Sequence, residues 1–355
     1  MPIEDHLASL KNKVDEELKM FFDNKIRQIK SQEKPDELLE MTENLREFIL
    51  RSGKRIRPIL FYCGYIIAGG RDKEKILKAA ISIELIHSFL LIHDDIIDQD
   101  NFRHGGLSMH CSYKNKYKNK NKNSKHFEIS MAIIVGDLAC NFGYEILSEA
   151  DFSSDLKIKT IRKMNQIISN TAAGEAADVE LSVNSSFDAN KIVEMQKYKT
   201  AKYTIEGPLH LGAVLAGADS KFLESISKFA IPLGIAFQIQ DDIIGIFGDE
   251  KKIGKPIGSD IEEGKKTLLI TKTIEQADNE QKEILINLLG SAKINLKEIE
   301  KVREIIIKTG SLEHSQKIAG ELIKTSKRRL EEMKILSQHQ GFLNDLADFI
   351  VGREH

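Results

Sequence analysis

The sequence predicts an all-α fold, and three observations support this class. Apolar residues recur at helical spacing along most of the 355-residue chain. Strand-like alternation is hard to find beyond short stretches. Pro occurs only 6 times, whereas Leu, Ile, Lys and Glu are abundant, a composition that favours helices over a sandwich or barrel.

The periodicity defines the expected helices in order. They cover residues 5–31, 35–51, 58–69, 73–99, 128–149, 154–173, 188–198, 200–217, 219–230, 232–247, 265–276, 279–289, 296–309 and, with breaks, 312–350. No linker rich in Pro, Gly or Ser divides this series. We therefore expect a single domain over residues 1–355, with residues 1–44 as an N-terminal helical segment packed on it.

Residues 114–125, KNKYKNKNKNSK, differ from the rest of the chain because they hold six Lys and four Asn. Such a segment buries too little apolar surface to offset the entropy of ordering it. We expect a flexible surface loop and favour it over an RNA-binding segment.

The charge balance limits the class of partner. Lys and Arg number 52 against 54 Asp and Glu, a formal net charge of -2. This argues against a strongly basic nucleic-acid binder, so no nucleic-acid partner is expected. Cys63, Cys111 and Cys140 form no CxxC pair, so the sequence supports neither a zinc ribbon nor a disulfide framework and fits a reducing cytoplasm.

The densest apolar stretch, Ile76–Ile97, is interrupted by Glu84, His87 and His93. We interpret it as a buried core helix and expect no membrane span. The charged N-terminus also lacks the apolar region of a signal peptide.

A short acidic element occurs twice, each time near the end of a strongly apolar helical pattern. Residues 93–98 read HDDIID, and residues 240–245 read QDDIIG. Positions i and i+4 share a helix face, so Asp94 and Asp98 can point the same way. Carboxylates on mostly buried helices need a cation to offset their desolvation. Mg²⁺ completed by water and substrate phosphate suits such sparse ligands, which implies a phosphorylated ligand.

Basic segments accompany both acidic elements. GKRIRP at 53–58 places three cations at a helix start, and Arg103-His104 follows the first element. Lys199-Thr200 interrupts an amphipathic segment, and 254–267 reads GKPIGSDIEEGKKT after the second element. Helix N-termini and Arg side chains both bind phosphate oxygens. No GxxxxGK[ST] pattern is present, so a P-loop NTPase is excluded.

Taken together, these motifs resemble the trans-type isoprenyl diphosphate synthases, or polyprenyl synthetases, from about residue 45 to the C-terminus. In the family's order they are GKRIRP at 53–58, HSFLLIHDDIID at 87–98, the arginine segment from 103, GEAAD at 174–178, KTAKYT at 199–204, FQIQDDIIG at 237–245 and GKPIGSDIEEGKKT at 254–267. The resemblance implies a single-domain antiparallel helical bundle of the isoprenoid synthase type around a central cavity, and a cytoplasmic homodimer.

The family joins an allylic diphosphate (dimethylallyl, geranyl or farnesyl) to isopentenyl diphosphate, head to tail, and releases pyrophosphate. The resemblance implies that Asp94, Asp98 and Asp241 hold Mg²⁺, three ions in all, bridged to the allylic diphosphate. Asp95 and Asp242 would support these ligands from behind.

The resemblance also assigns roles to the basic and polar residues. The allylic diphosphate would be bound by Arg103, Lys199, Lys255 and Lys265, with Thr200 and Gln238 near the allylic carbons. Isopentenyl diphosphate would be bound by Lys54, Arg57 and His87, while Glu175 and Asp178 would be supporting polar groups. Asp94, Asp98, Asp241, Arg103 and Lys199 are the expected catalytic set.

Two departures from the family pattern stand out. The family usually has two successive arginines where this chain has Arg103-His104, which puts the strength of isopentenyl diphosphate binding in doubt. The second acidic element ends in Gly245 rather than Asp. The 114–125 loop is also long for its position in the family pattern. One hypothesis is that it forms a mobile, positively charged lid that attracts diphosphates, and the alternative is a surface loop without a role in activity.

The resemblance also implies that product length depends on the residues four and five positions before Asp94. In the family, bulky side chains there close the product tunnel, and here they are Leu90 and Phe89. A single aromatic at the fifth position is similar to archaeal-type geranylgeranyl diphosphate synthases, so geranylgeranyl diphosphate is the expected product.

Other functions stay open at this point. One is a farnesyl or longer-chain product. Another is a class I terpene cyclase, which would want Ser or Thr in place of Gly245 and would not need GKRIRP. A third is a non-catalytic subunit of a heteromeric synthase, although such subunits tend to lose their aspartates. A helical scaffold without activity is the remaining possibility.

Overall fold

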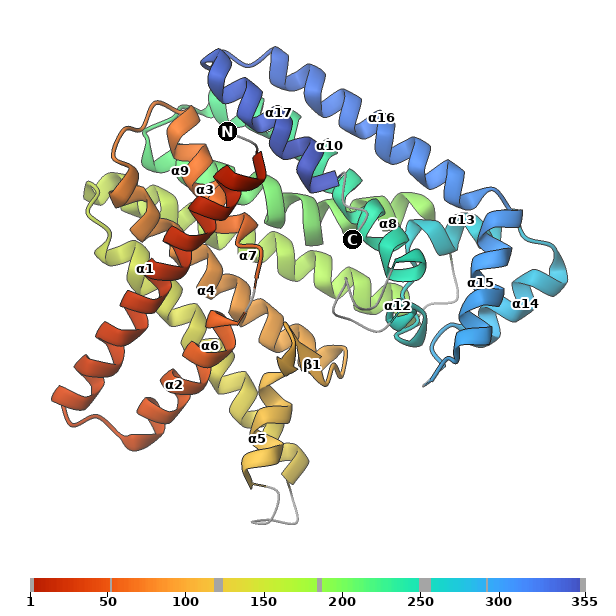
Figure 1. The fold of residues 1–355 in the computed structure, drawn as a ribbon, viewed down its shortest axis with the longest axis horizontal. Helices are drawn as coiled ribbons and strands as arrows, with labels where there is room; N and C mark the ends of the chain where they lie inside the picture. Colours follow the sequence, from red (N-terminus) through yellow and green to blue (C-terminus); the bar gives the residue numbers. More distant parts are fainter. Residues whose placement is uncertain are drawn as a thin grey trace. The chain divides into compact units, whose positions relative to one another are not determined.

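The computed structural model describes residues 3–51, 53–117, 124–183, 187–248, 257–291 and 293–351. Within these ranges the chain is almost wholly helical (Figure 1). The strands in this part of the chain are β1 (Phe102–Arg103) and β2 (Gly106–Leu107), which pair antiparallel. The predicted all-α class is confirmed.

Contacts along the chain group it into two compact units. The N-terminal unit comprises Met1–Arg162 and Leu211–Gly217, and the C-terminal unit comprises Lys163–His210 and Ala218–His355. The expected single domain stays a prediction, and the two units are described separately below.

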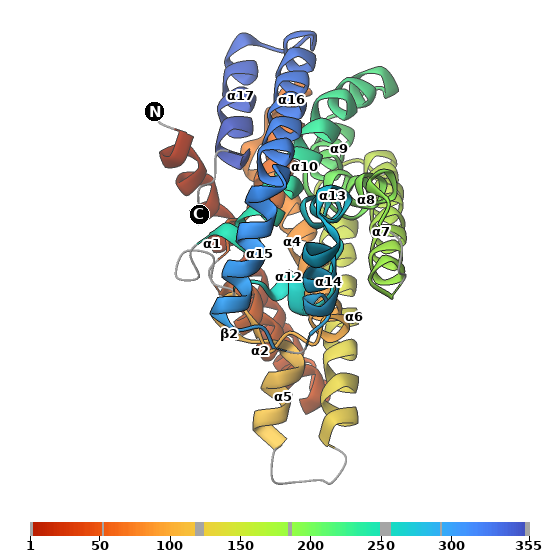
Figure 2. The same ribbon diagram turned by 90° about the vertical axis from the view of Figure 1, so that its right-hand side faces the viewer.

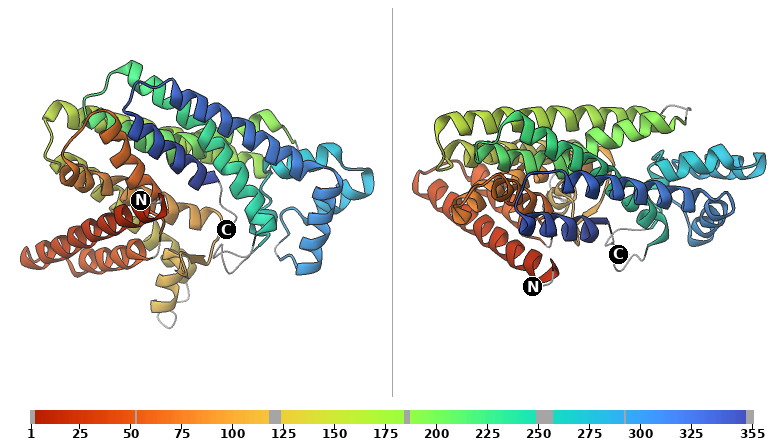
Figure 3. Two further views of the ribbon diagram at one scale, coloured as in Figure 1. Left: turned by 45° about the horizontal axis from the view of Figure 1, so that its top comes forward. Right: turned by 90° about the horizontal axis from the view of Figure 1, so that it is seen from above.

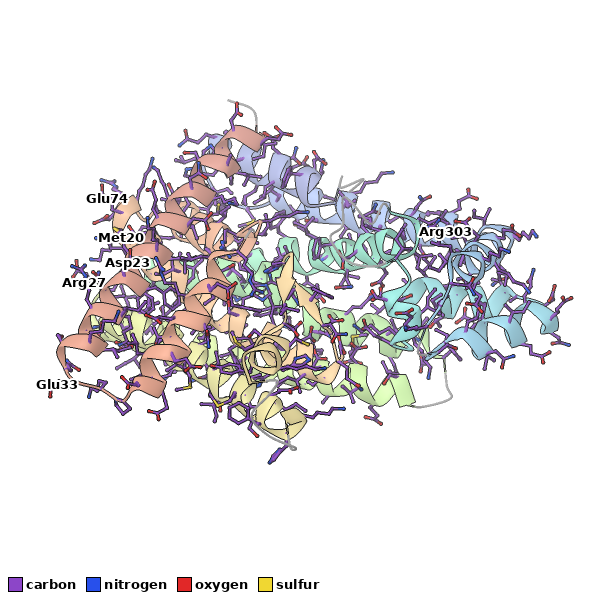
Figure 4. The ribbon with its side chains drawn as sticks, turned by 60° about the horizontal axis from the view of Figure 1, so that its bottom comes forward. Met20, Asp23, Arg27, Glu33, Glu74 and Arg303 are labelled. Atoms are coloured by element: carbon purple, nitrogen blue, oxygen red, sulfur yellow. The ribbon has the colours of Figure 1, made fainter. Side chains whose placement is uncertain are left out.

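The N-terminal unit is built around the apolar helix α4. Its elements are α1 (Ile3–Ser31), α2 (Asp36–Leu50), α3 (Ile56–Ile67), α4 (Lys73–Ile97), the β1–β2 hairpin, α5 (Met109–Tyr117), α6 (Ser124–Glu149), the start of α7 (Ser154–Val183) and the last residues of α9 (Gly207–Leu215). Phe22, Leu45, Leu85 and Val135 bring α1, α2, α4 and α6 into one buried core. The opposite face of α1 carries exposed Met20, labelled in Figure 4.

The C-terminal unit is built around α10 (Ser220–Phe247). Its other elements are the rest of α7, α8 (Ala189–Gln196), the π-helix η1 (Lys197–Glu206), the start of α9, α12 (Ser259–Glu262), α13 (Leu268–Gln276), α14 (Asn279–Leu288), α15 (Leu296–Lys308), α16 (Ser311–Glu331) and α17 (Ser337–Val351). The helices α16 and α17 pack along α10, as Figures 2 and 3 show. Side-chain caps begin several of these helices, including capping boxes at Asp278 and Asn295.

Several boundaries differ from the sequence prediction. The helix α10 continues through Pro232, where the sequence predicted a break. Proline in a helix interior removes a backbone donor. Near Pro232 the helix α10 packs against α16, where Ser326 Oγ donates to Phe229 O at 2.8 Å. The hairpin and α5 were not predicted, because two-residue strands and a nine-residue polar helix carry little periodicity. The prediction of a loop over 114–125 is wrong for residues 114–117, which end α5, and its residues 118–123 lie outside the described residues.

By length and composition alone, three helices in the described part of the chain could cross a membrane: α4, the 125–149 part of α6, and α10. Burial within the protein covers 67%, 39% and 56% of their most apolar windows. The expected absence of a membrane span therefore stays a prediction, and α6 has the least covered of the three windows.

A buried histidine predicts a pH-dependent stability. His210 Nε2 donates to Leu223 O at 2.9 Å, and burial lowers the pKa of His210, with Lys163 and Lys202 also lowering it and Glu206 raising it. Below the unfolded value near 6.5 the unfolded chain binds more protons than the folded one, so stability falls as the pH falls.

We expect the His210→Gln variant, whose amide can keep the bond to Leu223, to flatten this dependence below the unfolded value near pH 6.5. Urea unfolding at a series of pH values measures the slope. Equal slopes for both proteins would show that His210 does not titrate on unfolding.

Candidate functional site

The first acidic element lies at the C-terminal end of α4. Asp72 caps the start of this helix by accepting from Lys75 N at 3.0 Å. At its other end Asp98 N donates to Asp94 O at 2.8 Å, so Asp94 and Asp98 are one turn apart. Both are half-buried, whereas Asp95 is completely buried. The element therefore presents two carboxylates outward and one inward.

The buried Asp95 carboxylate is held by Arg103 of β1. Arg103 Nε donates to Asp95 Oδ1 at 2.6 Å, and its Nη2 forms ion pairs with Asp95, with Asp100 at 2.9 Å and with Asp94 at 3.6 Å. Burial raises the pKa of Asp95 to about 7 against the opposing effect of the Arg103 charge. Arg103 was predicted to bind diphosphate, and the structure places it, 8% exposed, among the carboxylates of this element.

A tight turn puts Arg103 in this position. His104 and Gly105 connect β1 to β2 with φ of 50° and 75°. Positive φ at both central residues is the geometry of a type I′ hairpin turn, which suits Gly at the second position and is unusual for a histidine. The residue that departs from the family pattern, His104, is therefore at the tip of the hairpin.

The GKRIRP segment separates its cations into two classes. Arg55 is 4% exposed and adopts a φ of 51° immediately before α3. Its guanidinium forms ion pairs with Asp15 at 2.7 Å and Glu84 at 2.6 Å, and donates to Ile49 O at 2.6 Å. Arg55 is thus a structural cation, and Glu84, one of the polar residues that interrupt the apolar stretch of α4, is its partner.

The other two cations of the segment face differently. Lys54 is exposed, and Arg57 is half-buried with its Nη1 3.0 Å from His87 Nε2. Burial, and then the charge of Arg57, holds the pKa of His87 well below its usual 6.5. His87 is therefore neutral near pH 7, accepts at Nε2 from Arg57 and carries its proton on Nδ1. The structure brings the predicted pair Arg57 and His87 together.

The second acidic element repeats the arrangement of the first on α10. Asp241 is exposed, and Asp242 is buried with 4% exposure. Gln196 Nε2 donates to Asp242 Oδ2 at 2.9 Å, and Gln238 Nε2 donates to Asp242 Oδ1 at 2.8 Å. Burial, and then the nearby Asp260 carboxylate, raises the pKa of Asp242 well above its usual value.

The network around Asp242 extends to η1. Thr200 Oγ1 donates to Gln238 Oε1 at 2.7 Å, so the predicted pair Thr200 and Gln238 is brought together. Gln196 was missed by the sequence prediction. Its position one turn before Thr200 places it on the same side of the chain as Thr200, and this spacing could have identified it from the sequence.

Lys199 lies beside two carboxylates of α7. Its Nζ is 2.9 Å from Glu175 Oε1 and 2.6 Å from Asp178 Oδ2. The sequence predicted Glu175 and Asp178 as supporting groups, and the structure brings both to the predicted lysine. The two carboxylates hold the flexible lysine side chain in one direction.

Of the predicted diphosphate-binding lysines that follow α10, Lys265 is among the described residues. Lys255 lies outside the described residues. Lys265 follows Gly264, which has a φ of 72°, and forms an ion pair with Glu263. The neighbouring Lys266 is buried, donating to Leu181 O at 2.8 Å and lying 5.0 Å from the Phe187 ring centroid.

The glycine that ends the second acidic element has a steric reason. A Cβ at Gly245 would lie 3.0 Å from Asp260 Oδ2. The Asp260 carboxylate therefore approaches the backbone where the first element has its third aspartate, Asp98. A larger residue at 245 would displace Asp260.

The donor set fits Mg²⁺ with few protein ligands. Among the described residues there is no group of three or more His, Cys, Asp or Glu side chains arranged to hold a metal ion. The outward-facing donors are carboxylates, Asp94 and Asp98 in one unit and Asp241 in the other. Mg²⁺ in proteins is commonly held by one or two carboxylates and completed by water and substrate phosphate, so these residues suit it.

Comparison with known proteins identifies the family. The model of the polyprenyl synthetase family matches residues 39–306. Geranylgeranyl diphosphate synthase of Sulfolobus acidocaldarius is 33% identical over 304 residues, covering 85% of this chain and 87% of that protein. The short chain isoprenyl diphosphate synthase of Methanocaldococcus jannaschii is 32% identical over 348 residues, covering 96% and 94%.

A solved structure shows the same fold. Geranylgeranyl pyrophosphate synthase from Corynebacterium glutamicum, complexed with isoprenyl diphosphate and magnesium, has a TM-score of 0.92 and 28% identity, covering 98% of this chain and 99% of that one. A family model that spans most of the chain, relatives above 30% identity and a shared fold agree with the motifs described above. The chain belongs to the polyprenyl synthetase family.

Proposed function

We propose that the protein is a trans-prenyltransferase that condenses isopentenyl diphosphate with an allylic diphosphate and makes geranylgeranyl diphosphate. The observation that carries this proposal is the repeated acidic element. Asp94 with Asp98, and Asp241, face outward, while Asp95 and Asp242 are buried behind them. Relatives that are 33% and 32% identical to this chain, from Sulfolobus acidocaldarius and Saccharolobus solfataricus, are named geranylgeranyl diphosphate synthases.

The outward carboxylates are proposed to hold Mg²⁺, three ions in all, against the allylic diphosphate. When bound, Mg²⁺ neutralises charge on the departing diphosphate. Asp95 and Asp242 keep their neighbours in place because hydrogen bonds from Arg103, Gln196 and Gln238 fix their orientation.

Cations of the chain are proposed to bind the diphosphates directly. In the C-terminal unit Lys199 and Lys265, with Lys255 from outside the described residues, bind the allylic diphosphate, and Thr200 and Gln238 lie by its allylic carbons. In the N-terminal unit Arg103 binds an allylic diphosphate, while Lys54, Arg57 and His87 bind isopentenyl diphosphate.

The chemistry explains why cations are needed. Breaking the allylic C–O bond leaves pyrophosphate with several negative charges, so cations fixed before the reaction lower its barrier. Lys199 is suited to this role because Glu175 and Asp178 orient its ammonium in advance. His87 is suited to its role because its neutral ring accepts from Arg57 and orients the guanidinium without repelling its positive charge.

The product length is proposed to depend on Phe89 and Leu90. Both are half-buried, and the Phe89 ring lies 4.8 Å from the His93 ring, centroid to centroid.

We expect Phe89→Ala to lengthen the product by one or more C5 units, because the small side chain no longer stops the growing chain. Chromatographic sizing of products measures this, with Phe152→Ala as control. An unchanged product distribution in the Phe89 variant would contradict the proposal that Phe89 limits the product length.

A homodimer is proposed with α6 at its interface. This helix is apolar, but much of its most apolar window is uncovered, and Ile133 and Ile134 are 41% and 47% exposed. Covering such a face with a second copy removes it from water.

We expect the wild-type protein to sediment as a dimer and Ile134→Glu as a monomer, since a buried charge opposes association. Ile158→Glu, at an equally exposed position on α7, is the matched control and should stay dimeric. A monomeric wild type, or a dimeric Ile134→Glu, would contradict the interface.

We also propose a cytoplasmic location, which the cysteines support. All three are free thiols in the structure, and burial raises the pKa of Cys63 to about 12. Cell fractionation with an antibody to the protein tests this proposal, and recovery in the membrane fraction would contradict it.

The experiment that tests the function uses purified protein, Mg²⁺, isopentenyl diphosphate and dimethylallyl, geranyl or farnesyl diphosphate in separate reactions. Chromatography of the products should show a C20 diphosphate as the main end product. Cyclic hydrocarbons from a single allylic substrate would instead identify a terpene cyclase, and no product from any pair would defeat the proposal.

A further inference from the structure

The π-helix η1 carries Lys199 and Thr200, and its backbone geometry is unusual. Gly207 N donates to Lys202 O, a bond spanning five residues rather than four. Helices of this kind are rare, have a wider turn than an α-helix and often lie at functional sites. A wider turn brings the backbone of η1 closer to the helices beside it. Those helices therefore need small residues at the positions where η1 approaches them.

Glycines provide that room on two sides of η1. A Cβ at Gly174 of α7 would lie 2.4 Å from Lys199 N and 2.7 Å from Lys199 Cα. A Cβ at Gly234 of α10 would lie 2.5 Å from Ala201 Cα. These are distances to backbone atoms, so a side chain at either position cannot be accommodated by turning a neighbouring side chain. It must push η1 away.

Each glycine is one turn before a residue through which its helix contacts η1. On α7, Asp178 follows Gly174 by four residues and accepts from Lys199 Nζ at 2.6 Å. On α10, Gln238 follows Gly234 by four residues and accepts from Thr200 Oγ1 at 2.7 Å. Residues four apart lie on the same helix face, so the close backbone approach and the polar contact occur on one face.

We propose that Gly174 and Gly234 are positioning residues that set how closely η1 lies against α7 and α10, and thereby fix Lys199 Nζ and Thr200 Oγ1 for the allylic diphosphate. This inference rests on the proposed function. The two glycines act through η1 and contact no substrate themselves. Displacing η1 would lengthen the Lys199 and Thr200 contacts even though every polar side chain is retained.

The test compares Gly174→Ala and Gly234→Ala with Gly320→Ala. Gly320 lies in α16, and a Cβ there would meet no atom within 4 Å, so this control adds the same methyl group in a helix without displacing anything. Misplacement of reacting groups by about 1 Å can cost about 100-fold in rate. We expect kcat/KM for the allylic substrate to fall about 10- to 100-fold in the first two variants.

The expected pattern is specific. KM for isopentenyl diphosphate, helix content by circular dichroism, and all constants of Gly320→Ala should stay near wild type. Calorimetry with inorganic pyrophosphate and Mg²⁺ should show weaker binding by Gly174→Ala than by Gly320→Ala. Folded Gly174→Ala and Gly234→Ala proteins that match Gly320→Ala in both kinetics and pyrophosphate binding would overturn the inference.

Two further outcomes stay informative. If the two alanine variants do not fold, Ala201→Gly removes a methyl group at the same contact without a clash, and it should also weaken pyrophosphate binding because η1 is less firmly held. Wild-type affinity in that variant would overturn the inference. If the wild-type protein binds pyrophosphate but forms no product, the proposed function fails, and the binding comparison still decides the role of the glycines.

Discussion

Replacing Asp94 by Ala is expected to lower kcat by about 1,000-fold or more while leaving the fold intact. Asp94 faces outward from the end of α4 and is a proposed Mg²⁺ ligand, so its loss removes charge stabilisation at the departing diphosphate. The surrounding structure should tolerate the change, because Arg103 keeps its contacts with Asp95 and Asp100.

Steady-state kinetics at saturating Mg²⁺ measures the effect, and circular dichroism checks the fold. Asp345→Ala, at an exposed position on α17, is the matched control and should retain full activity. More than a tenth of wild-type kcat in Asp94→Ala would remove this carboxylate from the catalytic set.

Replacing Arg55 by Met is expected to lower the free energy of unfolding by about 3–5 kcal/mol. The guanidinium is buried against Glu84 and Asp15 and also donates to Ile49 O. Methionine keeps much of the apolar stem but leaves the Glu84 carboxylate buried without its cation. The cost is the uncompensated charge rather than the net value of the ion pair.

Urea unfolding measures this change, with Arg71→Met, at an exposed position, as control. Adding Glu84→Gln to Arg55→Met should recover part of the loss, since the orphaned charge is then removed. A loss below about 1 kcal/mol, the typical range for a surface pair, would mean that Arg55 is not a structural cation.

The class of fold and the acidic elements could be predicted because they depend on local spacing. Helical periodicity survives in any long helix with one buried face, as in α4 and α10. The i, i+4 spacing likewise places Asp94 and Asp98 on one face before any tertiary contact is known. The pairs Arg57 with His87 and Thr200 with Gln238 were expected as groups on the strength of the family motifs.

The rest depends on contacts between distant segments. Nothing local distinguishes Arg55 from Arg57, which are two residues apart. Their different roles follow from the positive φ of Arg55, which turns its side chain toward Asp15 and Glu84. Lys265 and Lys266 differ for the same kind of reason, since Lys266 contacts the end of α7 and the Phe187 ring and is buried.

The π-helix geometry of η1 was also beyond the sequence, because an α-helix and a π-helix carry similar apolar patterns over ten residues. The close approach of Gly174 and Gly234 to its backbone is a three-dimensional fact with no signal in composition. The sequence pattern marked Lys199 and Thr200 as chemically important but gave no account of what holds them.

The most direct test of prenyl transfer is the release of pyrophosphate by the purified protein with Mg²⁺, isopentenyl diphosphate and farnesyl diphosphate. One pyrophosphate should appear for each C–C bond formed, and none when either diphosphate or Mg²⁺ is omitted. Pyrophosphate release from farnesyl diphosphate alone, or no release with both substrates present, would contradict the assignment as a prenyltransferase.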